Sequence, residues 1–474
     1  MKKLSPSIYL FLIGSVLLCS CTKFNDSINT DPNNPTKASG TQLIANAELS
    51  LPGIGSSPYG VHYPQYLSNT SFTDNSRYTT INFNFYSLYT GPLMNLENAI
   101  NSELSANEGP VPNQIAVAKI LKAYFYWHMT DRWGPLPYTT ALKGKDNFTP
   151  AYDNQQSIYN SLFTLLDEAN ATIVTTNGTV KNDIVYGGDI NKWKKLGNTI
   201  HLLMALRLSK VDAAKGAAEF NKAVTNGIMT ANSDNLSYPH LLEQNNENYW
   251  YNQFTRLGRN WFALSKPLVD YMLPLNDPRL AIYGNKNTAG NYVGLEYGKA
   301  VPNSNDINNV SLLGSSLRQQ NSAVALVTYA QALFAVAEAA KLGWVTGGDA
   351  TAKINYDLAI QNSISQWTGS TTGAATFLAQ VGVQYNAANA IQQIAYQRWV
   401  HLFLHGYEGW AEWRRTGYPI LVAAAGANGD KIPRREGYPT QERANNTTNY
   451  NAAVAAFPYS GADDLNARVW WDKP

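Results

Sequence analysis

Two carboxylates, Glu408 and Glu412, stand four residues apart in a segment with helical spacing. A glycosidase uses a pair of carboxylates as its acid and its base or nucleophile, so this spacing could in principle serve hydrolysis. Arg414 and Arg415 follow directly in the sequence. Opposite charges at this spacing favour ion pairing along a helix. We therefore expect the two carboxylates to belong to a structural ion-pair network.

Two other groups of residues could bind a metal. His401 and His405 are four residues apart and could share an ion, but no third ligand of a suitable type lies near them in the sequence, which favours packed or capping histidines. Residues 303–309, with Asp306, offer oxygens to Ca²⁺, although Asn-rich segments mostly form turns. The sequence predicts neither a metal nor a cofactor.

The common catalytic motifs are missing from the sequence. It has no H-E-x-x-H, no phosphate-binding loop, no G-x-G-x-x-G after a strand and no G-x-S-x-G. We therefore expect a protein that is not an enzyme.

Aromatic residues are the chemical feature in which the chain is rich. They make up 12% of it, with 29 Tyr and 12 Trp, and many fall in segments without helical spacing. A flat ring can stack on the C–H face of a sugar while amide, carboxylate and guanidinium neighbours bind the hydroxyls, although the same rings can equally fill a core. The predicted ligand-binding residues are Tyr63, Tyr66, Asn69, Asp74, Arg77, Tyr78, Trp250 and Trp261, with Phe72 among the other rings of the first segment.

Composition narrows the class of protein further. The chain has 474 residues, 44% of them hydrophobic and only 15% charged, which excludes disorder over most of its length. Without Lys2 and Lys3 it carries 34 basic and 34 acidic residues. A chain without net charge is not expected to bind nucleic acid.

The N-terminus has the pattern of a secreted lipoprotein. Lys2 and Lys3 precede an apolar run over residues 8–18, which is too short for the ~20 residues of a membrane span. Leu18-Cys19-Ser20-Cys21 resembles a bacterial lipoprotein box, cut before Cys21, whose thiol then carries lipid. We predict a signal peptide over residues 1–20, a lipidated tether over 21–39 and one folded domain over 40–474.

Apolar spacing predicts helices in that domain. The segments are 113–130, a helix after an N-cap at Asp189 that reaches Arg207, 326–337 with its end at Gly343, 350–366, and 391–405 with its end at Gly406. Helices joined by short turns resemble degenerate tetratricopeptide pairs. Long aperiodic segments lie between them at 52–92, 234–259 and 283–316. The predicted fold is mainly α, a scaffold of tetratricopeptide-like helix pairs with long ligand-binding loops.

Short motifs along the whole chain resemble those of the SusD/RagB-like nutrient-binding lipoproteins of the Bacteroidetes outer membrane, second SusD-like subfamily. They are Asn29-Thr30-Asp31-Pro32-Asn33 behind the lipid cysteine, Trp133-Gly134-Pro135-Leu136-Pro137-Tyr138, Gly188-Asp189 with Lys192-Trp193, Asn276-Asp277-Pro278-Arg279, Ala337-Glu338-Ala339, Glu412-Trp413-Arg414-Arg415, Pro433-Arg434-Arg435 with Tyr438-Pro439 and Glu442, and Trp470-Trp471-Asp472.

This resemblance implies an outer-membrane, lipid-anchored protein exposed at the cell surface. It would capture a nutrient, most often an oligosaccharide, and deliver it to a SusC-like TonB-dependent barrel transporter. Two alternatives stay open at this stage: a secreted helical glycoside hydrolase, and a peptide-binding or scaffold lipoprotein. The sequence does not identify the ligand.

Overall fold

The computed structural model describes residues 38–101, 104–176, 178–458 and 460–474. The predicted signal peptide, Cys21 and nearly all of the predicted tether lie outside these ranges. The first described helix, α2, begins at Gly40 behind Ser39, whose hydroxyl accepts a hydrogen bond from the Gln42 amide. Within the described ranges, no helix combines the length and the apolar character needed to cross a membrane.

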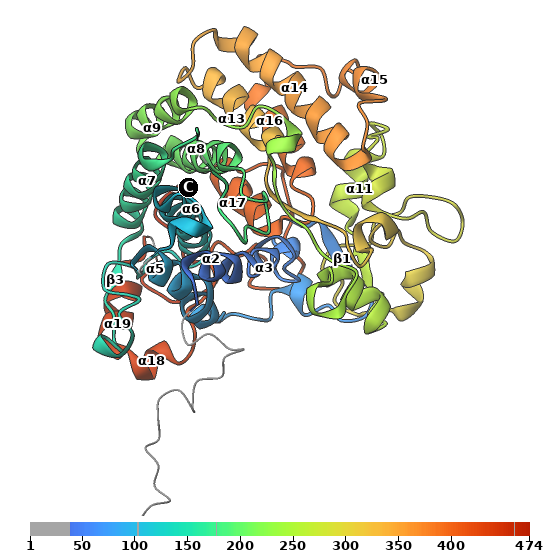
Figure 1. The fold of residues 1–474 in the computed structure, drawn as a ribbon. Coiled ribbons are helices and arrows are strands. Elements are labelled where there is room, and N and C mark those ends of the chain that lie inside the picture. The colour runs from blue at the N-terminus through green and yellow to red at the C-terminus, as the bar shows by residue number, and fades with distance from the viewer. Residues whose placement is uncertain (1–37, 102–103, 177, 459) are drawn as a thin grey trace, which may run out of the picture.

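Consecutive helices pack in pairs and form the scaffold (Figure 1). The pairs stack from α6 to α9 and continue through α13 to α17, so the prediction of a mainly α scaffold is confirmed. The pairs are α6 (Val111–Trp133) with α7 (Gln155–Thr172), α8 (Ile190–Arg207) with α9 (Ala213–Asn226), α13 (Tyr329–Lys341) with α14 (Gly348–Thr368), and α16 (Ala390–His401) with α17 (Gly406–Thr416).

Local signals set several helix ends. Asp189 caps α8 as predicted, because its carboxylate accepts hydrogen bonds from the Asn191 and Lys192 amides at 3.0 and 3.4 Å. Helix α13 begins later than predicted, since Thr328 and Gln331 form a capping box and Leu326 lies in a strand.

The prediction that one helix runs to His405 and stops at Gly406 is wrong. Helix α16 already ends at His401, and Gly406 instead starts α17. Position 406 needs a glycine because the backbone of Gly60 passes close to it, and not because a helix ends there. A Cβ on residue 406 would lie 2.2 Å from the carbonyl carbon of Gly60, so any side chain there would push the backbone around Gly60 away from α17.

The remaining elements are short and fasten the long loops to the scaffold. The described residues form three antiparallel two-stranded sheets, none of which was predicted; two of them join distant parts of the chain, and one closes the loop between α6 and α7. They are β1 (Leu67–Asn69) with β5 (Phe262–Leu264), β2 (Leu136–Pro137) with β3 (Tyr152–Asp153), and β4 (Leu236–Tyr238) with β6 (Val324–Val327). The other α-helices are α2 (Gly40–Glu48), α3 (Pro52–Gly55), α4 (Tyr86–Leu88), α5 (Met94–Asn101), α10 (Tyr249–Tyr251), α11 (Lys266–Met272), α12 (Leu280–Tyr283), α15 (Ala374–Leu378), α18 (Glu442–Asn445) and α19 (Thr447–Ala455).

The apolar core has more than one centre. The largest cluster lies between the scaffold helices, the N-terminal helices and the C-terminal segment. A second cluster lies beneath the β1–β5 sheet and contains Tyr66, Trp250, Phe262, Trp399 and Phe403. The loops around β1 and β5 therefore have a core of their own, which lies against α16 and the turn that follows it.

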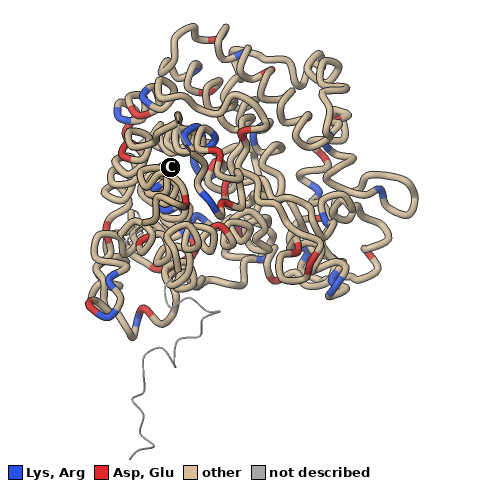
Figure 2. Tube along the Cα trace, viewed as in Figure 1, with Lys and Arg blue, Asp and Glu red and all other residues tan. Residues whose placement is uncertain are grey.

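A buried ion-pair network crosses the scaffold, as the spacing of Glu408 and Glu412 with the following arginines predicted. Glu412 on α17 accepts hydrogen bonds from Arg207 on α8, Arg398 on α16 and Arg415 on its own helix. Each of these three guanidinium groups is at most 3% exposed. In Figure 2, acidic and basic positions accordingly gather in the middle of the molecule around α17.

Further carboxylates complete this network. Glu338 on α13 pairs with Arg398 at 2.7 Å and Arg415 at 2.6 Å. Asp131 on α6 and Glu408 on α17 pair with Arg207 at 3.2 and 2.6 Å. Burial raises the pKa of Glu338, but Arg415 and Arg398 outweigh burial and hold that pKa at about 2. Since this pKa lies below its ordinary value of 4.5, the carboxylate contributes stability above pH 4.5 that is lost as the pH falls toward 2.

Replacing Glu412 by Ala should lower the free energy of unfolding by about 3–5 kcal/mol, because three buried guanidinium groups lose a shared partner. The measurement is urea denaturation followed by tryptophan fluorescence. Asp270→Ala is the control, since the Lys266–Asp270 pair is 57% exposed on both sides and its loss should cost less than about 1 kcal/mol. Equal stability of the two variants would contradict a structural role for the network.

Candidate ligand-binding surface

Two aromatic side chains, Phe72 and Trp261, lie together at the surface of the loops. Their ring centroids are 4.6 Å apart with an interplanar angle of 57°, Phe72 is 63% exposed, and Trp261 is partly exposed. We call these two side chains the ring pair. They come from parts of the chain almost 190 residues apart, in or beside two of the aperiodic segments that the sequence marked as aromatic.

The β1–β5 sheet brings the ring pair together. Asn69 faces Phe262 across the sheet, and the amide of Thr70 donates to the carbonyl oxygen of Trp261 at 3.0 Å. The buried Asn69 side chain then donates to the carbonyl oxygen of Phe72 at 2.8 Å and so holds the turn that presents the ring. The rings therefore rest on a hydrogen-bonded support.

Polar side chains lie on or next to the same loops as the ring pair. Asp74 is exposed two residues beyond Phe72. Arg77 is partly buried and donates to the carbonyl oxygen of Gly298 at 2.8 Å. The exposed Asn303 is held next to β1, because its amide donates to the carbonyl oxygen of Thr70 at 2.9 Å. An aromatic face bordered by carboxylate, guanidinium and amide groups can stack on a sugar ring and bind its hydroxyls.

Five of the predicted ligand-binding side chains are buried in this structure. Tyr66 donates its hydroxyl to the carbonyl oxygen of Trp399 at 2.7 Å, and Trp250 packs edge-on against Phe262 at 5.2 Å. Tyr63 stacks on Trp410 at 4.5 Å. The buried set is Tyr63, Tyr66, Asn69, Tyr78 and Trp250, each at most 5% exposed, while Asp74, Arg77 and Trp261 reach the surface.

The buried rings support the surface without forming it. Trp250 lies beneath Phe262, and Phe262 in turn lies 5.8 Å from Trp261. Phe72 was not among the predicted ligand-binding residues. It is nevertheless the one aromatic side chain of residues 52–92 that is largely exposed, since the others are buried or partly buried. A signal for it existed in the sequence: it lies between the turn-forming residues Ser71 and Thr73-Asp74-Asn75, where a side chain tends to point outward.

The predicted histidine and carboxylate candidates are held by core contacts. His401 lies 2.7 Å from the Thr328 hydroxyl and 2.9 Å from the Ser363 hydroxyl, which confirms its interpretation as a packed histidine. Burial lowers the pKa of His401 to about 3 and that of His405 to about 4. Across the described part of the chain, no three His, Cys, Asp or Glu side chains gather in a way that could hold a metal. Asp306, the calcium candidate, pairs with Lys299 at 2.6 Å.

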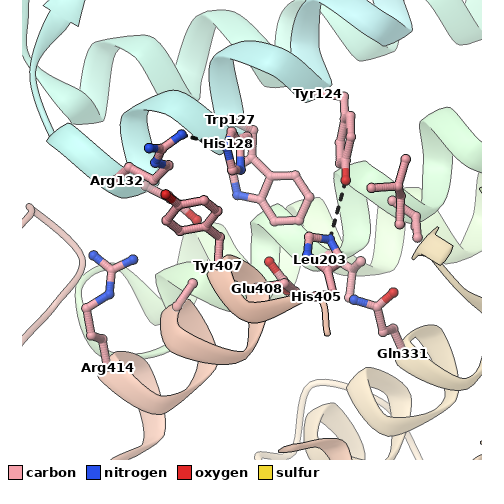
Figure 3. Close-up of a pocket in the computed structure, with 14 residues that line it drawn as sticks. Tyr124, Trp127, His128, Arg132, Leu203, Gln331, His405, Tyr407, Glu408 and Arg414 are labelled. Atoms are coloured by element: carbon pink, nitrogen blue, oxygen red, sulfur yellow. Dashed lines mark hydrogen bonds between the residues drawn. The ribbon is translucent and has the colours of Figure 1, made fainter. Parts of the chain in front are cut away.

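A small polar cavity lies between α6, α8 and α17 (Figure 3). Tyr124 points toward His405, and Arg132 points toward His128. Glu408 also lines this cavity while its carboxylate pairs with Arg207. At about 20 Å³ the cavity has room for about one water molecule, so it does not admit a sugar ring.

Comparison with known protein families identifies the family of this chain. A family model described as starch-binding and associating with the outer membrane matches residues 32–439, most of the sequence. The chain belongs to the SusD-like family. The resemblance carried by the short motifs is thereby confirmed.

Solved structures of SusD-like proteins share the fold. A chitin-binding protein is 28% identical, with a TM-score of 0.79 over 92% of this chain and 100% of its own. A chitin-binding SusD homologue from Flavobacterium johnsoniae is 25% identical, with a TM-score of 0.77 over 92% and 98%. A SusD homologue from Bacteroides fragilis is 24% identical, with a TM-score of 0.79 over 92% and 100%, and shows the fold alone. No similar sequence is found among curated proteins.

The different positions of two tryptophans give a testable difference in stability. Trp250→Ala removes a side chain that is 1% exposed and should lower the free energy of unfolding by about 3–5 kcal/mol through the cavity it leaves. Trp261→Ala removes a partly exposed ring that packs against the second core cluster, and it should cost less, about 1–2 kcal/mol. Urea denaturation followed by circular dichroism measures both changes. A larger loss for Trp261→Ala than for Trp250→Ala would contradict the placement of the two rings.

Proposed function

We propose that this SusD-like protein captures a glycan at the ring pair and binds it without changing it chemically. The observation that carries this proposal is the exposed pair of Phe72 and Trp261, supported by the β1–β5 sheet. When a sugar ring stacks its C–H face on an exposed aromatic ring, the apolar faces of both are removed from water, and this favours binding. The family description and the names of two similar structures, which refer to starch and chitin, support a glycan as the ligand class.

The neighbouring polar groups fit a neutral sugar. Asp74 and Arg77, on the loop that carries Phe72, and Asn303, whose amide is bonded to Thr70, provide one carboxylate, one guanidinium group and one side-chain amide. Such groups donate to and accept from hydroxyls, while their opposite charges leave little net attraction for a charged ligand. A neutral hexose or N-acetylhexosamine chain has the hydroxyl and amide groups that they can bind.

Phe72→Ala and Trp261→Ala should each weaken glycan binding by about 1–3 kcal/mol, because each removes one stacking surface of the ring pair. Isothermal titration calorimetry with chito-oligosaccharides and malto-oligosaccharides measures the affinities. The matched control is Phe148→Ala, since Phe148 is also an exposed phenylalanine (81%) but lies in the distant loop before β3.

The same titrations separate the alternatives. Unchanged affinity in both ring-pair variants would contradict binding at this surface. Release of reducing ends from the oligosaccharides would indicate a glycoside hydrolase. A wild-type protein that binds neither glycan would contradict glycan capture and favour a peptide ligand or a scaffold role.

We further propose that the protein is attached to the outer membrane at the cell surface by lipid on Cys21 and delivers its ligand to a SusC-like transporter. The lipoprotein-box pattern, the polar segment that follows it and the family's association with the outer membrane support this proposal. Residues 1–20 would be removed, and residues 21–39 would link the lipid to the domain that starts near Gly40.

Purification of the C-terminally tagged protein from gently solubilised membranes should recover a TonB-dependent barrel protein in about equal amount, as identified by mass spectrometry. Cys21→Ala should move the protein into the soluble fraction, because the acyl chains supply its membrane affinity. A lipidated protein that is recovered without any barrel partner would contradict the delivery step.

A further inference from the structure

A second cavity lies at the end of the molecule opposite the ring pair. It is formed by the segment 85–94, the loop 141–150 and helix α18, near β3 and α19, whereas β1 lies at the other side (Figure 1). Its volume of about 350 Å³ is within the range of small-molecule sites. Because Glu442 lies in its wall, we call it the Glu442 cavity.

Most of the wall of the Glu442 cavity is apolar. Tyr86, Tyr89 and Met94 line one side, and Leu142 and Phe148 line the other. Phe148 is 81% exposed, which leaves a large ring at the entrance with little contact to the protein. An exposed ring over an apolar cavity favours a ligand with an apolar body that the ring can cover.

The one acidic group in this wall is a carboxylate with no cationic partner. Glu442 is 6% exposed and accepts hydrogen bonds from the hydroxyls of Tyr86 and Tyr152, the latter at 2.5 Å. Burial, followed by the hydrogen bond to Glu442, raises the pKa of both tyrosines, so they remain protonated donors at neutral pH. No Lys, Arg or His among the described residues comes within ion-pairing distance of Glu442; its neighbour Arg443 lies 3.9 Å from Asp463 instead.

None of the other charged groups near the cavity pairs with Glu442. Arg435, the nearest buried arginine in sequence, pairs with Asp463 at 2.6 Å. Lys143 lies exposed at the rim, where solvent screens it. Asp153 on β3 is bonded by the Thr139 hydroxyl at 2.9 Å. A buried carboxylate with only neutral donors still lacks the cation that would offset the cost of removing it from water.

We propose that the Glu442 cavity binds an organic cation, an ammonium group carried on a small apolar body. The ammonium group would donate a charge-assisted hydrogen bond to Glu442 Oε1, which accepts from Tyr86 alone. The rings of Tyr86, Tyr89 and Phe148 line the same cavity, and the π face of an aromatic ring attracts a cation. The apolar wall would cover the rest of the ligand.

The test uses three probes of similar size and different charge: 2-phenylethylammonium, 2-phenylethanol and phenylacetate. Ligand-observed NMR titrations of the full-length folded protein should give an affinity for the cation about tenfold higher than for the alcohol, and the weakest binding for the anion. Glu442→Gln should abolish the preference for the cation over the alcohol. Equal affinity of the wild type for cation and alcohol, no binding of any probe, or a preference that survives in Glu442→Gln would overturn the proposal.

Two further variants keep the test decisive if Glu442→Gln does not fold. Phe148→Ala removes an exposed ring, so it should fold normally and bind the cation several-fold more weakly; unchanged affinity would overturn the proposal. Phe72→Ala, at the ring pair, should bind the cation as the wild type does, and a loss there would place the probe at the wrong site. Glycan binding should be weakened by Phe72→Ala and unchanged in Phe148→Ala. The two variants therefore distinguish a failure of the proposed cation site from a failure of the proposed glycan site.

Discussion

The arrangement of the scaffold depends on one carboxylate, Glu412, which three arginines share in the interior. Arg207, Arg398 and Arg415 also contact Asp131, Glu408 and Glu338, so α6, α8, α13, α16 and α17 meet in a single hydrogen-bonded network. Every charge of the network except the partly buried Glu408 is buried, and a buried charge is tolerated only when its partners are in place. If one helix pair slid past another, a buried charge would lose its partner in an apolar environment. The network therefore fixes the relative positions of the helix pairs, which apolar packing alone would not determine.

The loops around β1 and β5 are held against the scaffold by a core of their own. Tyr66 donates to the Trp399 carbonyl, the Trp399 indole donates to the Pro64 carbonyl at 2.8 Å, and Trp250 and Phe262 pack beside them. The β1–β5 sheet lies on this second core and presents the ring pair outward. A loop surface built in this way can change its exposed residues without disturbing the scaffold, which is how one fold can serve different ligands.

Sequence reasoning succeeded where local pattern determines structure and failed where distant contacts do. Helices α6 and α8 were predictable because a cap or a terminal glycine bounds a repeated apolar face. The strands β1 and β5 were not, since three residues have no usable period and their pairing joins Asn69 to Phe262. The same limit applies to the site. The aromatic segments were identified, but Tyr66 and Phe72 differ in burial only because the first faces Trp399 and the second faces solvent.

The two candidate sites differ in shape and charge, and this difference assigns them different classes of ligand. The ring pair is an exposed surface whose polar neighbours include both signs of charge, so a long neutral chain can lie across it and extend beyond it on either side. The Glu442 cavity has a volume of about 350 Å³ and is lined by a carboxylate that pairs with no cation among the described residues. A space of this size suits a small molecule, and a neutral sugar would leave its apolar wall poorly matched. Because the sites share no residue and lie at opposite ends of the molecule (Figure 1), a ligand at one does not block access to the other.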